Sequence, residues 1–106
     1  MNTFENTAVV EMVRFKLNAG VAQEDYLAAC AKTDAFVQAQ PGFRARALSL
    51  AEDGTWTDYV TWADMDSALA AAKAFPENEH AQALIGMIDG STLQMWHETK
   101  LWSAAA

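Results

Sequence analysis

The first part of the chain has a strand pattern followed by a helix pattern. Residues 8–17 are rich in apolar and β-branched side chains and end at Asn18-Ala19-Gly20, a turn signal, which predicts a strand. Acidic residues then open a segment whose apolar residues recur at helical spacing until Pro41-Gly42, so a helix of about twenty residues is predicted there. Its apolar stripe consists of Leu27, Cys30, Ala31, Phe36 and Val37.

Residues 43–51 and 55–63 form the clearest pair of strands. Asp53-Gly54 between them is a strong signal for a two-residue hairpin turn, because both residue types tolerate a positive φ. With these two residues as the turn, Ala47 faces Val60 and Ala45 faces Trp62, and small residues opposite large ones pack well. The same register places five side chains on the other face of the hairpin: Arg44, Arg46, Leu48, Leu50 and Tyr59.

The last part of the chain predicts helices and a final strand. Asp64 or Asp66 can cap a helix over the strong helix formers of residues 67–74, and Pro76 ends or kinks that helix. The pattern then predicts, in order, a further helix, a turn and a last strand: residues 77–87, Asp89-Gly90 and residues 92–102.

The order of these elements is β-α-β-β-α(α)-β, which is the ferredoxin-like arrangement. It predicts one α+β domain over residues 1–106, with a four-stranded antiparallel sheet in the order 4-1-3-2 and helices on one face only. The opposite face would expose a large apolar patch, which is unusual on a monomer. A homodimer that pairs two such faces is therefore predicted, and a monomer with an apolar sheet face is the alternative. The predicted patch consists of Val10, Met12, Leu48, Leu50, Tyr59, Trp96 and Trp102.

Charge and composition exclude several classes of partner. The net charge is −7, from 14 acidic and 7 basic residues, so binding to nucleic acid or to an anionic membrane is not expected. The single cysteine, Cys30, excludes an intramolecular disulfide. The sequence contains no secretory signal and no apolar run near the length of a membrane span, which predicts a cytoplasmic protein.

The junctions between the predicted elements carry a family resemblance. The residues concerned are Phe36 with Pro41-Gly42-Phe43, then Asp53-Gly54, Trp56, Asp58, Val60 and Trp62 in the hairpin, and Ala68 with Ala71 in the following helix. On these residues the chain resembles the dimeric α/β-barrel superfamily, and within it the antibiotic-biosynthesis monooxygenase-like group. The resemblance implies cofactor-free oxidation of aromatic substrates, although haem degradation and small isomerisations also occur in the superfamily. The haem-degrading branch expects an asparagine in the first strand, where this chain offers only Glu11 and Arg14 as polar candidates.

The predicted sheet brings three titratable residues to its helix-facing side. Strand alternation places Glu11 on the first strand between Asp58 on the third and His97 on the fourth. His97, held by Glu11 or Asp58, could remove a proton from a phenol or an activated methylene group. The resemblance then implies that the resulting carbanion reacts with dioxygen without metal or flavin. The predicted catalytic residues are therefore His97, Glu11 and Asp58, with no cofactor and no metal. The apolar residues predicted to bind a small aromatic or quinone-like compound are Trp62, Phe36, Phe15 and Met95.

Each of these residues also has a purely structural interpretation. His97 could be an ordinary histidine on a half-buried strand, Asp58 could cap local backbone, and Glu11 could pair with a nearby basic residue. Trp62 could simply fill the core. These interpretations together describe a non-catalytic homodimer that binds a small ligand or serves an accessory role.

The remaining candidate residues carry weaker signals. His80 stands apart from any metal-binding spacing and is predicted to be an exposed helix histidine. Cys30 is predicted to be a small buried apolar residue. Arg44 and Arg46 are predicted to form charge pairs at the subunit boundary, with an acidic-ligand clamp as the alternative.

Overall fold

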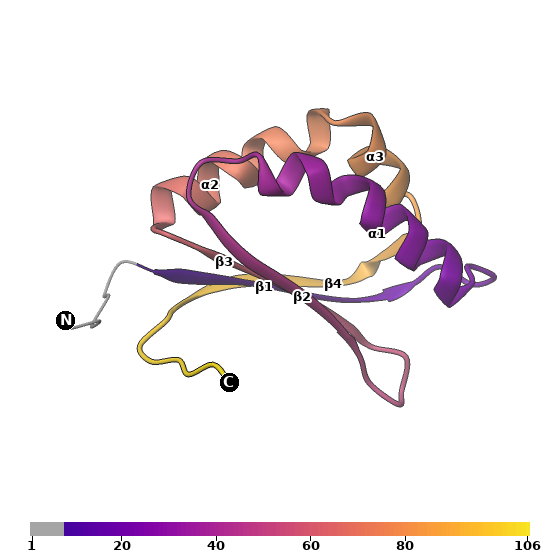
Figure 1. Ribbon diagram of the computed structural model, residues 1–106. Coiled ribbons are helices and arrows are strands. Elements are labelled where there is room, and N and C mark those ends of the chain that lie inside the picture. Colours follow the sequence, from indigo (N-terminus) through magenta and orange to yellow (C-terminus); the bar gives the residue numbers. More distant parts are fainter. Residues whose placement is uncertain (1–7) are drawn as a thin grey trace.

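The sheet and the helices form two layers in the computed structural model, which describes residues 8–106 (Figure 1). The strands are β1 (Val9–Leu17), β2 (Phe43–Leu50), β3 (Trp56–Trp62) and β4 (Ile88–Thr99), and the helices are α1 (Gln23–Gln38), α2 (Met65–Ala74), the 3₁₀ turn η1 (Phe75–Glu77) and α3 (Glu79–Ile85). All helices cover one face of the sheet (Figure 1). The strand order is β2-β3-β1-β4 with antiparallel pairing, so the predicted ferredoxin-like topology is confirmed.

The central strand β1 determines which side chains face the helices. Glu11 lies opposite Val60 of β3 and opposite His97 of β4. Because strand side chains alternate, the odd-numbered residues from Val9 to Phe15 share the helix-facing side, and Phe15 is 1% exposed there. The strand parity predicted for β1, β3 and β4 is therefore correct.

The hairpin register differs from the prediction by one residue. Ala47 lies opposite Tyr59, not Val60, because the loop has three residues: the Gly54 amide donates to the Ala51 carbonyl at 3.0 Å and the Ala51 amide donates to the Thr55 carbonyl at 2.8 Å. A two-residue type I′ turn would need a positive φ at both Asp53 and Gly54, but only Gly54 has one, at 88°. As a result Arg46 and Leu48 face the helices, opposite Val60 and Asp58, and their predicted place on the opposite face is wrong.

The buried stripe of α1 also differs from the predicted one. It consists of Tyr26, Ala29, Thr33 and Val37, while Leu27 is 44% exposed. The helix has 16 residues and ends before Pro41-Gly42. Gly42 has a φ of 82° in a turn that the Phe43 amide closes by donating to the Gln40 carbonyl.

The second half of the chain follows the prediction with shifted bounds. Asp64 is the N-cap of α2, where its Oδ1 accepts from the Ser67 amide at 2.8 Å. Asn78 caps the short α3 in the same way. Strand β4 begins at Ile88, so the predicted turn at Asp89-Gly90 is wrong, and it ends at Thr99.

The face of the sheet away from the helices has no covering element among the described residues (Figure 1). Tyr59 is 37% exposed, and Val10, Met12 and Trp96 are half-buried. Trp102 lies beyond β4 and is 78% exposed. The apolar patch on this face is smaller than predicted, since Leu48 belongs to the core between sheet and helices and Leu50, opposite Trp56, also lies on the helix-facing side.

Candidate functional site

A cavity of about 350 Å³ lies between the helix-facing side of the sheet and the helices. Side chains from all four strands contribute to its wall, together with residues of α1, α2, η1 and α3. Cavities of this size, mostly apolar with a few polar groups, are typical of small-molecule sites. Six of the predicted site residues line it: Glu11, Phe15, Phe36, Asp58, Trp62 and Met95. Among the residues that the structure describes, His97 does not line this cavity.

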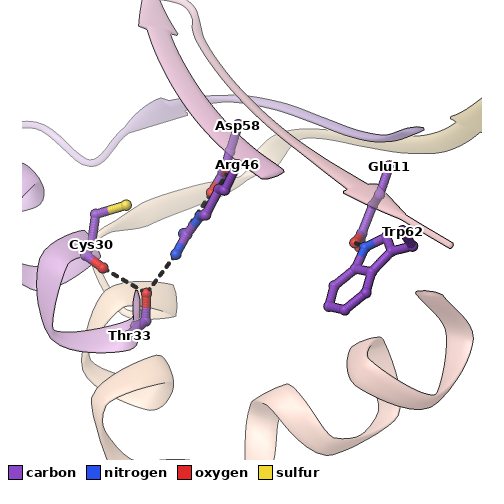
Figure 2. A network of polar contacts seen from close by, with 6 residues as sticks. All are labelled: Glu11, Cys30, Thr33, Arg46, Asp58 and Trp62. Atoms are coloured by element: carbon purple, nitrogen blue, oxygen red, sulfur yellow. Dashed lines mark hydrogen bonds and ion pairs between the residues drawn. The ribbon is translucent and has the colours of Figure 1, made fainter. Parts of the chain in front are cut away.

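Glu11 presents a buried carboxyl group to the cavity. The Trp62 indole Nε1 donates a hydrogen bond to Glu11 Oε1 at 3.0 Å (Figure 2). Burial raises the pKa of Glu11, while the bond from Trp62 and the charge of His97 oppose that rise. Glu11 is therefore a carboxyl group in a largely apolar wall, fixed in position through one of its two oxygens.

Asp58 forms a two-point ion pair with Arg46 across β3 and β2. Arg46 Nε donates to Asp58 Oδ1 at 3.2 Å and Nη2 donates to Oδ2 at 2.8 Å, with the two side chains only 9% and 12% exposed. Arg46 Nη1 also donates to the buried Thr33 hydroxyl at 3.0 Å, and that hydroxyl donates to the Cys30 carbonyl at 2.7 Å (Figure 2). This network ties the hairpin to α1 at one side of the cavity.

Arg46 was missed as a cavity residue because of the hairpin register. Its predicted place was the opposite face and a charge pair at a subunit boundary; instead it lines the cavity beside Asp58. The buried Tyr26 was missed as well, because the predicted stripe of α1 did not include it. The available signal was an arginine and an aspartate on neighbouring strands of one hairpin, but only the correct loop length places their side chains on the same face.

Two polar side-chain atoms are buried without a hydrogen-bond partner among residues 8–106. They are the Tyr26 hydroxyl and His97 Nε2. Burial raises the pKa of Tyr26, and the charge of Asp58 adds to that effect, so the hydroxyl keeps its proton. Tyr26 lines the cavity, whereas His97 lies next to Glu11 on the neighbouring strand. Hydrogen bonds thus connect Glu11 to Trp62 and Asp58 to Arg46, and they do not join Glu11, Asp58 and His97 to one another.

The other candidate residues do not form a further site. His80 is exposed, with its Nε2 4.0 Å from Glu79 Oε1. Burial raises the pKa of the Cys30 thiol, which lowers the fraction present as the reactive thiolate. Within the described part of the chain, no group of three or more His, Cys, Asp or Glu residues is placed to hold a metal ion. None of the helices there has the length and apolarity needed to cross a membrane.

Comparison with solved structures identifies the fold. SnoaB, a cofactor-independent oxygenase from Streptomyces nogalater, superimposes with a TM-score of 0.75 at 24% identity, over 92% of this chain and 96% of that one. The chain has the fold of the antibiotic-biosynthesis monooxygenase-like proteins. The ActVA-Orf6 monooxygenase of Streptomyces coelicolor, solved with the ligand Nanaomycin D, matches at a TM-score of 0.71 and 17% identity, over 95% and 94% of the two chains. A protein of unknown function from Nitrosomonas europaea matches at 0.65 and 20%, over 96% and 97%.

The resemblance expected from the sequence is thus confirmed as a shared monooxygenase-like fold. No family model and no curated protein matches the chain, so the likeness rests on the tertiary structure. Within this monooxygenase-like fold, Glu11 is the polar side chain that β1 contributes to the cavity, while Arg14 is exposed. Fold alone does not determine chemistry, and the site residues must carry any functional argument.

Proposed function

We propose that the protein is a cofactor-independent monooxygenase-like enzyme that acts on a small aromatic or quinone-like compound in the cavity. The observation that carries this proposal is the buried Glu11 carboxyl, with a raised pKa, in the wall of a mostly apolar cavity. A carboxylate whose pKa is raised by burial is a stronger base than one in water, which suits the removal of a proton from carbon. The aromatic rings of Trp62, Phe36 and Phe75 offer surfaces for a planar substrate.

In this proposal Glu11 removes a proton from an activated methylene group of the substrate. The carbanion transfers one electron to dioxygen, and the two radicals combine into a peroxide that Glu11 protonates. Loss of water from the hydroperoxide leaves a ketone, so one oxygen atom enters the product and the other leaves as water. The substrate supplies all four electrons that reduce dioxygen. Trp62 holds Glu11 toward the cavity, and Asp58 stays paired with Arg46.

Glu11→Gln is expected to lower the rate of oxygen uptake by at least about a hundredfold, because the amide cannot accept the proton. The measurement uses an oxygen electrode with anthrone, whose methylene group lies between two aromatic rings, after subtraction of spontaneous oxidation. Glu52→Gln, in the exposed hairpin loop, is the matched control and should retain the wild-type rate. A Glu11→Gln protein that consumes oxygen like the wild type would remove the proposed base.

The same assay tests the role of His97 through its pH profile. The rate should rise with pH as Glu11 loses its proton, with an inflection above the ordinary pKa of 4.5 because burial raises the pKa of Glu11. The charge of His97 lowers the pKa of Glu11, so His97→Ala should move the inflection to higher pH. An unchanged inflection in His97→Ala would show that His97 does not act through Glu11, and complete loss of activity at every pH would favour His97 as the base itself.

A second candidate function is ligand binding without catalysis. It is favoured by the hydrogen bonds that already engage Glu11 and both oxygens of Asp58 within the protein. Binding of anthrone without any protein-dependent uptake of oxygen would support this function over the enzymatic one.

We propose further that two copies of the chain form a homodimer through the sheet face that the helices leave uncovered. Met12 lies near the middle of this face, flanked by Tyr59 of β3 and Trp96 of β4. A face of this kind is self-complementary about a two-fold axis, and its pairing would bury apolar side chains without altering the cavity.

Met12→Glu is expected to convert the dimer into a monomer of 11.6 kDa, because two carboxylates would meet at the centre of the interface. Sedimentation velocity at micromolar concentration measures the mass. Met65→Glu on the exposed side of α2 is the matched control and should leave the mass unchanged. A wild-type protein that sediments at 11.6 kDa would disprove the dimer.

A further inference from the structure

We infer that the Tyr26 hydroxyl and the Arg46 guanidinium form a donor site for an oxygen atom of the ligand, at the side of the cavity formed by β2 and α1. The preferred ligand is then an aromatic compound with a ring carbonyl oxygen, held by that oxygen. This inference rests on the cavity of the proposed function as a ligand site, and it does not depend on the reaction with dioxygen.

Tyr26 is the first observation behind this donor site. The residue is 0% exposed and lines the cavity, and its hydroxyl has no hydrogen-bond partner within residues 8–106. Its ring is fixed between Phe15 and Trp56, with ring centroids 5.5 Å and 5.1 Å away. A buried hydroxyl without a partner is unfavourable, and a tyrosine held so firmly cannot turn to find one. An oxygen acceptor on a ligand would satisfy it.

Arg46 supplies the second observation. Its guanidinium has five N–H groups, of which Asp58 accepts two and Thr33 accepts one. Two N–H groups therefore remain for a ligand. Arg46 and Asp58 line the same cavity as Tyr26, and the charges of both side chains act on the pKa of the Tyr26 hydroxyl, so the three groups lie within electrostatic reach of one another along this wall.

The charges at this place favour a neutral acceptor over an anion. Asp58 neutralises the charge of Arg46, and its two oxygens already accept hydrogen bonds. The Thr33 hydroxyl both accepts from Arg46 and donates to the Cys30 carbonyl. The groups that can still form hydrogen bonds to a ligand are thus mainly donors. A ketone oxygen accepts from such donors, and unlike an anion it carries no net charge that must be desolvated.

The opposite side of the cavity is apolar and reaches the surface. The cavity residues Ile85, Leu93 and Met95 are 43%, 47% and 46% exposed, and two of them belong to the edge strand β4. Strands β2 and β4 are three strand spacings apart, about 14 Å. A ligand that enters past β4 would therefore carry its oxygen inward to Tyr26 and Arg46 and leave its hydrocarbon part beside the opening.

The test compares two bicyclic compounds that differ in one ketone oxygen, 1-tetralone and tetralin. Isothermal titration calorimetry on the wild-type protein is expected to give at least tenfold tighter binding for 1-tetralone, since hydrogen bonds of this kind contribute about that factor. Tyr26→Phe should remove most of this preference by weakening 1-tetralone and leaving tetralin unchanged. Tyr59→Phe, on the opposite face of the sheet, is the matched control and should behave as the wild type.

If the Tyr26 hydroxyl served only to stabilise the fold, Tyr26→Phe would lower the melting temperature. Loss of a buried hydroxyl without a partner should leave the melting temperature of Tyr26→Phe at or above the wild-type value, so weaker binding could not be ascribed to unfolding. Equal binding of the two compounds by the wild type, an unchanged preference in Tyr26→Phe, or no binding of either compound up to its solubility would overturn the inference. A ketone preference without oxygen uptake would support the donor site and count against the proposed enzyme.

Discussion

Arg46→Ala is expected to lower the free energy of unfolding by about 3–5 kcal/mol. The Asp58 side chain, 12% exposed in the native protein, loses its two-point partner in this variant. The substitution also leaves the buried Thr33 hydroxyl without the donor from β2. An unpaired buried charge costs far more than the ion pair contributes, because the carboxylate has lost its water without compensation. Urea unfolding at a fixed protein concentration measures the loss.

Two further variants separate the unpaired charge from a general effect of truncation. Arg14→Ala removes an exposed arginine of β1 and should change stability by less than about 0.5 kcal/mol. The double variant Arg46→Met with Asp58→Leu removes both charges and should recover much of the loss, since apolar residues of similar volume commonly replace a buried ion pair well. A loss below about 1 kcal/mol in Arg46→Ala would show that Asp58 reaches water.

Trp62→Ala is expected to lower the free energy of unfolding by about 3–5 kcal/mol, the usual cost of deleting a large core aromatic. Trp62 is 2% exposed, packs with Val9, Val37 and the α2 alanines, and meets Phe43 edge-on at 5.9 Å between ring centroids. The variant also removes the only hydrogen bond of the Glu11 side chain within residues 8–106. Urea unfolding again gives the value, and a cost under about 1 kcal/mol would show that the ring lines an open site without supporting the core.

Trp62→Phe helps to divide this effect into packing and hydrogen bonding. The smaller ring keeps part of the apolar contact but loses the Nε1 donor to Glu11. It should therefore cost less than Trp62→Ala. An equal cost in the two variants would mean that the indole N–H, and not the ring, accounts for the stabilisation.

Much of the fold followed from local sequence signals. Alternation along residues 8–17 predicted the helix-facing side of β1 correctly, because Arg14 and Lys16 fall on one side of the pleat and the large Phe15 falls on the other. Asp64 and Asp66 were the two predicted caps of α2, and Asp64 is the one whose side-chain oxygen satisfies a free backbone amide. The lining of the cavity by Glu11, Asp58 and Trp62 followed from the same alternation once the strand order was known.

The bounds of β4 and the stripe of α1 were harder to predict. Asp89-Gly90 has turn composition, yet Asp89 pairs with Lys16 of β1, and neighbouring strand residues outweigh local turn preference. In α1 the alanine-rich sequence offers several weakly apolar faces, and Tyr26 is buried because Phe15 and Trp56 enclose its ring. Helix propensity alone does not choose among such faces.

The sequence by itself therefore determined the topology, the layers and the carboxylates that reach the cavity, because these depend on periodicity and caps that act over a few residues. Only the tertiary structure decided the register of the hairpin, and with it the place of Arg46. A two-residue loop and a three-residue loop can both contain Asp53-Gly54. The two differ by one residue in register, and such a shift exchanges the two faces of β2. The choice between them depends on what the whole of β2 packs against: the ion pair with Asp58 and the burial of Leu48 below α1 are contacts between distant segments, which no local pattern contains.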